Sequence, residues 1–89
     1  MKKLRAINAP RERLGVVGIL VPDAAPGKDR VAGLLSEYGS IIIGKAELPC
    51  SERDMTLTCV AIKASTNDLG AFTGKLGLVL GVRVKSLLF

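Results

Sequence analysis

Few residues in this chain could carry out chemistry, and its two cysteines are the first candidates. Cys50 lies in a polar connection, where we expect an exposed thiol, and Cys59 lies in an apolar strand, where we expect a small buried hydrophobic residue. The chain has no histidine, so it lacks the most common general acid–base and cannot form a nitrogen-rich metal site from side chains. The sequence therefore predicts no enzyme activity, no cofactor and no metal, although a thiolate-only site shared between subunits stays open.

A row of glycines between residues 66 and 85 is the second feature that could serve binding. On a helix, Gly70, Gly74, Gly77 and Gly81 fall within about 60° of one another. Each glycine inside a helix costs about 1 kcal/mol relative to alanine, so a repeated row needs a reason. It predicts the close approach of a strand, of a neighbouring subunit, or of a small molecule at a subunit boundary.

The Gly-Lys pair in this row is not a phosphate-binding P-loop. That motif needs four residues between its glycines and a Ser or Thr after the lysine, whereas three residues separate Gly70 from Gly74 here, and Leu76 follows the lysine. Two further glycines in an apolar strand allow close packing against a helix or, alternatively, against a ligand. The candidate ligand or interface residues are Gly15, Gly18, Gly70, Gly74, Lys75, Gly77 and Arg83.

Hydrophobic periodicity predicts the elements that position these residues. Apolar runs and alternation predict strands at 14–21, 40–48, 55–64 and 82–88,. One helix precedes Gly39, which we expect to stop it in the left-handed conformation, and a second runs from about residue 68 to residue 80. The apolar faces of the two helices carry Val31, Leu34, Leu35 and Tyr38 in the first, and Leu69, Phe72, Leu76 and Val79 in the second.

The order βαββαβ predicts an α+β, ferredoxin-like sandwich. Right-handed crossovers place both helices on one face of a four-stranded antiparallel sheet and leave the other face open. In residues 55–64, Thr56, Thr58, Val60 and Ile62 alternate with Leu57, Cys59 and Ala61, so neither face is strongly polar. We expect helices on one face and a second subunit on the other.

The net charge of +5 is concentrated at the start of the chain. Residues 1–13 carry five basic residues and one acidic residue, or +4, and residues 14–89 carry eight basic and seven acidic residues, or +1. We therefore expect a flexible basic tail at 1–13 and a nearly neutral domain at 14–89. We expect no nucleic-acid partner except through this tail. The chain has no apolar run of the about 18 residues that a membrane span needs, so we expect a cytoplasmic protein with no membrane partner.

The last third of the chain resembles a small family known as the iron-only hydrogenase system regulators. The shared pattern is Leu69-Gly70-Ala71, then Gly74-Lys75-Leu76-Gly77, then Gly81-Val82-Arg83-Val84-Lys85. Weaker similarity extends over residues 14–86. Members of this family resemble the C-terminal regulatory domain of the nickel-responsive repressor and the wider ACT-like group.

The resemblance implies a ferredoxin-like fold, a homo-oligomer of dimers that pair into tetramers, and a role in regulation. The nickel site of the repressor uses histidines and a cysteine, so nickel sensing does not carry over to a chain without histidine. The DNA-binding domain of the repressor has no counterpart here, so regulation of transcription would require a partner or the basic tail. The sequence thus predicts a non-enzymatic, oligomeric regulatory module that senses a ligand. An ACT-like protein with a small-molecule effector at a subunit interface is the alternative.

Overall fold

The computed structural model describes residues 11–24 and 26–89, so residues 1–10 of the expected basic tail lie outside the described residues. The order of helices and strands is βαββαβ, as the sequence predicts. The elements are β1 (Arg13–Pro22), α1 (Lys28–Glu37), the 3-10 turn η1 (Gly39–Ile41), β2 (Ile42–Cys50), the 3-10 turn η2 (Ser51–Arg53), β3 (Met55–Ala64), α2 (Thr66–Gly77) and β4 (Arg83–Leu88).

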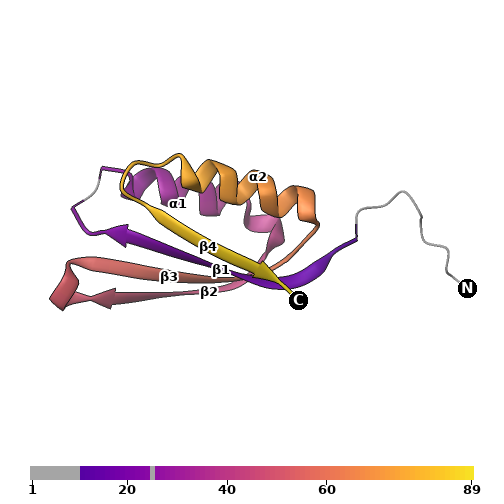
Figure 1. Cartoon of the computed structure of the whole chain (residues 1–89), viewed down its shortest axis with the longest axis horizontal. Helices are drawn as coiled ribbons and strands as arrows, with labels where there is room; N and C mark the ends of the chain where they lie inside the picture. The colour runs from indigo at the N-terminus through magenta and orange to yellow at the C-terminus, as the bar shows by residue number, and fades with distance from the viewer. Residues whose placement is uncertain (1–10, 25) are drawn as a thin grey trace, which may run out of the picture.

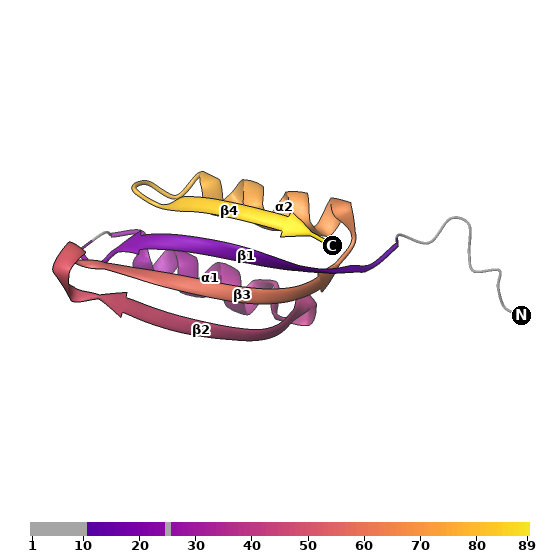
Figure 2. The ribbon, with the colours of Figure 1, turned by 60° about the horizontal axis from the view of Figure 1, so that its bottom comes forward.

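The four strands form one antiparallel sheet in the order β2-β3-β1-β4. Figures 1 and 2 show both helices on the same face of this sheet, with α2 beside β4, and Figure 2 shows α1 behind β1 and β3. The α+β, ferredoxin-like fold predicted from the sequence is therefore confirmed. The central strands β1 and β3 are paired along ten positions, from Arg13 opposite Ala64 to Pro22 opposite Met55.

The core lies between the helices and one face of the sheet. Val60 and Ile62 of β3 are buried there, and Thr58 joins them, because alternate side chains of a strand point to the same face,. From the helix side, Phe72 is fully buried and its ring lies 5.0 Å from the ring of Tyr38. The apolar faces predicted for the two helices are confirmed by the burial of Val31, Leu34, Leu35, Leu69, Phe72 and Leu76.

The ends of the helices differ from the prediction. Gly39 does not stop α1 in the left-handed conformation, because Gly81 is the only described glycine with positive φ. The chain instead turns through η1, which brings Ile41 into the core. Helix α2 begins after Ser65, whose hydroxyl accepts a hydrogen bond from the Asp68 N–H at 3.1 Å, and ends at Gly77, three residues earlier than expected.

Cys59 is exposed in the single chain, so the prediction that it is buried is wrong for the chain alone. Its register partners are Gly18 in β1 and Ala46 in β2, and all three point to the sheet face that no helix covers. The strand alternation that buries Thr58 and Val60 requires this orientation. Cys50 is exposed, as expected, and both thiols are free.

Gly15 permits the close pairing of β1 with β4, rather than the packing against a helix that the sequence suggested. A methyl group built on Gly15 would overlap the backbone carbonyl oxygen of Leu87, and it would lie 2.8 Å from a side-chain carbon of Leu88. Gly18, three residues further along β1, has more room, with the Lys85 carbonyl oxygen 3.9 Å from such a methyl group. The two glycines of one strand therefore have different roles.

Gly15→Ala is expected to destabilise the fold by about 1–3 kcal/mol, because β4 must shift to make room. Gly18→Ala is the matched control in the same strand, and it should be neutral or stabilise the fold by up to about 1 kcal/mol, since alanine loses less conformational entropy than glycine. Urea unfolding of both variants measures the difference. Equal stabilities for the two variants would contradict this role for Gly15.

Candidate functional site

The groove between α2 and the edge strand β4 brings together four of the seven residues that the sequence indicated. Gly70, Gly74 and Gly77 line its helix wall, and Arg83 lies along its strand wall. The groove is open to solvent and has a volume of about 660 Å³. Its remaining lining residues are Thr73, Val82, Val84, Lys85 and Ser86.

The glycine row leaves this groove empty within the chain. A methyl group built on Gly70, Gly74 or Gly77 would meet no atom within 4 Å. Among the described residues, these glycines therefore do not pack closely against a strand of the same chain, which was one of the predicted explanations. The explanations that remain are a neighbouring molecule of protein and a small ligand.

Lys75 lies outside the groove and connects the two helices. Its ammonium group donates a hydrogen bond to the Glu37 carboxylate at 2.9 Å, and lies 5.1 Å from the centre of the Tyr38 ring. The hydrogen bond from Lys75 lowers the pKa of Glu37 below its ordinary value, and the same bond raises the pKa of Lys75. This geometry indicates a contact between α1 and α2 on the surface.

Gly15 and Gly18 do not join the groove, so the seven candidate residues do not form one site. Gly15 faces the helices and Gly18 faces the opposite side of the sheet, because they are separated by an odd number of positions in β1,. Neither of them lines the groove beside α2.

The face of the sheet away from the helices is largely apolar, and we call it the open face. All four strands contribute side chains to it, and most of these side chains are apolar or small. Its charged side chains are near the edges, with Arg83 and Lys85 on β4 and Lys63 at one end of β3. Its apolar and small residues include Leu14, Val16, Gly18, Leu20, Ala46, Leu48, Leu57, Cys59, Ala61 and Leu87.

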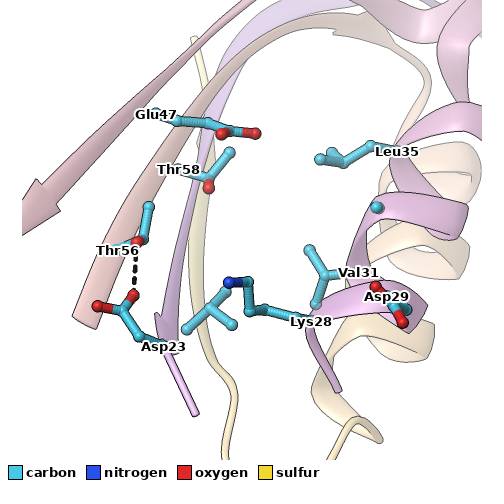
Figure 3. Close-up of a pocket in the computed structure, with 10 residues that line it drawn as sticks. Asp23, Lys28, Asp29, Val31, Leu35, Glu47, Thr56 and Thr58 are labelled. Carbon is cyan, nitrogen blue, oxygen red and sulfur yellow. Dashed lines mark hydrogen bonds between the residues drawn. The ribbon is translucent and has the colours of Figure 1, made fainter. Parts of the chain in front are cut away.

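A separate pocket of about 250 Å³ lies on the helix side, between the start of α1 and the strands (Figure 3). Lys28 reaches across one end of it toward the strands, and Glu47 reaches from β2 toward α1 at the other end. Val31 and Leu35 form an apolar wall on the helix, and Thr56 and Thr58 form a polar wall on β3.

The polar groups of this pocket suit a small molecule with charges of both signs. The Thr56 hydroxyl donates a hydrogen bond to the Asp23 carboxylate at 2.8 Å, which positions the loop after β1. In the described part of the chain, neither Lys28 nor Glu47 takes part in an ion pair. Lys28 could therefore bind an anionic group and Glu47 a cationic group, with the apolar wall between them.

Lys28 and Glu47 were not among the residues that the sequence indicated. A signal for the pocket was present, because Thr56 and Thr58 lie on the same predicted face as Val60 and Ile62. Two hydroxyl groups on the core side of a strand indicate a place that the core does not fill completely. The partners from α1 and β2 depend on the tertiary structure.

Among residues 11–24 and 26–89, no three His, Cys, Asp or Glu side chains lie close enough together to hold a metal ion. In the same part of the chain, no helix is long and apolar enough to cross a membrane.

Comparison with protein families gives one match, which covers residues 13–86. The matching model is the TM1266-like family, described as proposed regulators of the iron-only hydrogenase system. The chain belongs to this family. This confirms the family resemblance seen in the pattern from Leu69 to Lys85, and no curated protein matches the chain.

Solved structures agree with this family and with the fold. Uncharacterized protein TM1266 from Thermotoga maritima is 29% identical, with a TM-score of 0.85 over 89% of this chain and 99% of that one. The C-terminal domain of the MgtC protein from Mycobacterium tuberculosis is 18% identical, with a TM-score of 0.64 over 86% of this chain and 87% of that one. The CPII protein from Thiomonas intermedia K12, in a structure with ADP, AMP and acetate, is 14% identical, with a TM-score of 0.51 over 91% of both chains.

Lys75→Met is expected to return the pKa of Glu37 toward its ordinary value of 4.5, because the hydrogen bond that favours the carboxylate is lost. The pKa of Glu37 is lower in the folded state than in the unfolded state, so the pair stabilises the fold at any pH above the unfolded-state pKa of Glu37. This stabilisation is lost as the pH falls through the folded-state pKa of Glu37. Carboxyl carbon NMR titration measures this pKa. Lys85→Met is the control and should leave Glu37 unchanged, and an unchanged pKa in Lys75→Met would disprove the contact.

Proposed function

We propose that the protein is a cytoplasmic, non-enzymatic regulatory module that self-associates through the open face of its sheet and responds to a small molecule. The observation that carries this proposal is the apolar open face, which the helices of the chain leave uncovered. It is supported by membership of a family of proposed regulators. In this proposal regulation proceeds through a partner protein, because the described residues form one ferredoxin-like domain and include no DNA-binding domain of their own.

The centre of the open face suits contact with a second copy of the chain. Leu57 lies opposite Leu20 on one side and opposite Leu48 on the other, which gives an apolar row across three strands. The neighbouring row contains Gly18, Cys59 and Ala46, whose small side chains leave a shallow surface. Apolar patches of this kind on soluble proteins mark interaction surfaces, and a second copy as a homodimer or within a homotetramer would cover this one.

Leu57→Asp is expected to turn the oligomer into a monomer at micromolar concentration. Leu57 is 39% exposed in the single chain, and burying an unpaired carboxylate in an interface costs about 3 kcal/mol, which corresponds to a weakening of self-association of about a hundredfold. Size-exclusion chromatography with light scattering measures the molar mass.

The matched control is Leu78→Asp, because Leu78 is 87% exposed and follows α2, away from the open face. This variant should keep the molar mass of the original protein. A monomeric original protein, or a Leu57→Asp variant with unchanged molar mass, would disprove self-association through this face.

For the small molecule, the pocket between Lys28 and Glu47 provides the best support. Its lining carries one cation, Lys28, three carboxylates, from Asp23, Asp29 and Glu47, and two hydroxyl groups beside an apolar wall. Charges of both signs suit a compact zwitterion such as an amino acid, and the excess of carboxylates favours its ammonium group. The CPII protein of the same fold is seen with ADP, AMP and acetate, so adenine nucleotides belong in the same test. The groove beside α2 is the alternative location, because Gly70, Gly74 and Arg83 line it.

A thermal-shift screen of amino acids, ADP and AMP is expected to find a ligand that raises the melting temperature. Lys28→Met and Glu47→Gln should each weaken its binding by about tenfold or more, because each removes one charge-assisted contact worth about 1.5–3 kcal/mol. Lys45→Met is the control on the same strand as Glu47 and should bind normally. A ligand whose binding is unaffected by both pocket variants would place the site elsewhere, and no shift with any compound would contradict ligand sensing.

A further inference from the structure

We infer that the outer edge of β4 binds an extended acidic segment of a partner protein, which adds to the sheet as a fifth strand. This inference concerns the edge strand and the groove beside it. It does not depend on self-association through the open face or on the pocket beside Lys28.

The backbone of β4 is free to accept another strand. Among the described residues, β4 pairs with β1 alone and forms one edge of the sheet, as Figure 2 shows. The Phe89 N–H donates a hydrogen bond to the Leu14 carbonyl oxygen at 2.8 Å, so the odd-numbered residues at this end of the chain direct their backbone groups toward β1. Because these directions alternate along a strand, Val84 and Ser86 direct their N–H and C=O groups away from the sheet.

The groove gives room for the side chains of an added strand. An added strand would lie about 4.8 Å from β4, and every second side chain would point toward the helix layer. On that side lies the groove of about 660 Å³, lined by Gly70, Gly74 and Gly77. A helix with larger side chains at these positions would fill the space that the added side chains need.

The charges along the edge favour an acidic partner. Arg83 and Lys85 point to the open face from β4, and no acidic residue lines the groove. Within residues 11–24 and 26–89, neither of these two cations forms an ion pair. A second copy of β4 would bring the same cations to the same edge, and like charges on neighbouring strands are destabilising.

The expected segment therefore alternates two kinds of residue. Acidic residues on one side would lie next to Arg83 and Lys85, and apolar residues on the other side would enter the groove against Val82, Val84 and the glycine row. Hydrogen bonds between main chains would supply affinity, and the alternating side chains would supply specificity.

A capped peptide of alternating Glu and Val, of about six to eight residues as in a typical strand, tests this inference. In an NMR titration of the full chain, the amide signals of Val84 and Ser86 are expected to shift. The double variant Arg83→Glu with Lys85→Glu should bind this peptide at least about tenfold more weakly. The same variant should bind a peptide of alternating Lys and Val, which the original protein should not bind.

Ser86→Pro is a second variant that blocks the outer edge. The Ser86 N–H points away from β1, so proline removes the outward donor without removing a hydrogen bond of the sheet. This variant should lose the peptide and keep the molar mass of the original protein. An unchanged molar mass separates this inference from self-association through the open face.

Three results would overturn the inference. One is the absence of Glu-Val peptide binding to the original protein at millimolar concentration. Another is equal binding of this peptide to the charge-reversed variant. The third is concentration-dependent broadening of the Val84 and Ser86 signals without peptide, abolished in Ser86→Pro, which would identify a second copy of the chain as the occupant.

Discussion

The sheet of this protein is apolar on both faces, but two helices can cover only one of them. The connections of a βαββαβ chain bring both helices to the same face, where Phe72 and Tyr38 pack between them over Val60 and Ile62. The second face carries Leu20, Leu48 and Leu57 in one row and is left to solvent in the single chain. Self-association is the physical solution that we propose for this surplus of apolar surface.

The edges of the sheet show a second consequence of the same arrangement. Helix α2 lies over β4 with its apolar stripe toward the core, so the stripe of glycines on another side of the helix borders the outer edge of β4. Within the part of the chain that the structure describes, this edge therefore combines backbone groups without a partner strand, an open groove and two cations outside any ion pair. On the other half of the helix layer, α1 leaves the pocket between Lys28 and Glu47 beside the end of the β2–β3 hairpin.

Much of the fold was predictable because the patterns behind it are local. The alternation in residues 55–64 predicts a strand with the same first and last residues as β3 in the structure. The spacing of Leu69, Phe72 and Leu76 identifies the core face of α2. The ends of elements were less predictable. Gly39 has the residue type of a helix stop, but the burial of Ile41 makes a 3-10 turn at this position more favourable. Cys59 was placed on the correct face of its strand, although whether that face is covered depends on a partner and not on the strand.

The sequence by itself determined the order of elements, the apolar faces and the family, since periodicity and short motifs depend on residues close together in the chain. It also drew attention to Gly70, Gly74, Gly77 and Arg83, four residues that do meet in one groove. Only the tertiary structure decided that Gly15 lies against the backbone of β4 and that Lys75 pairs with Glu37. The structure also brings Lys28 and Glu47 to one pocket. These contacts join positions far apart in sequence. They arise when strands pair and helices pack, and no pattern among neighbouring residues predicts them.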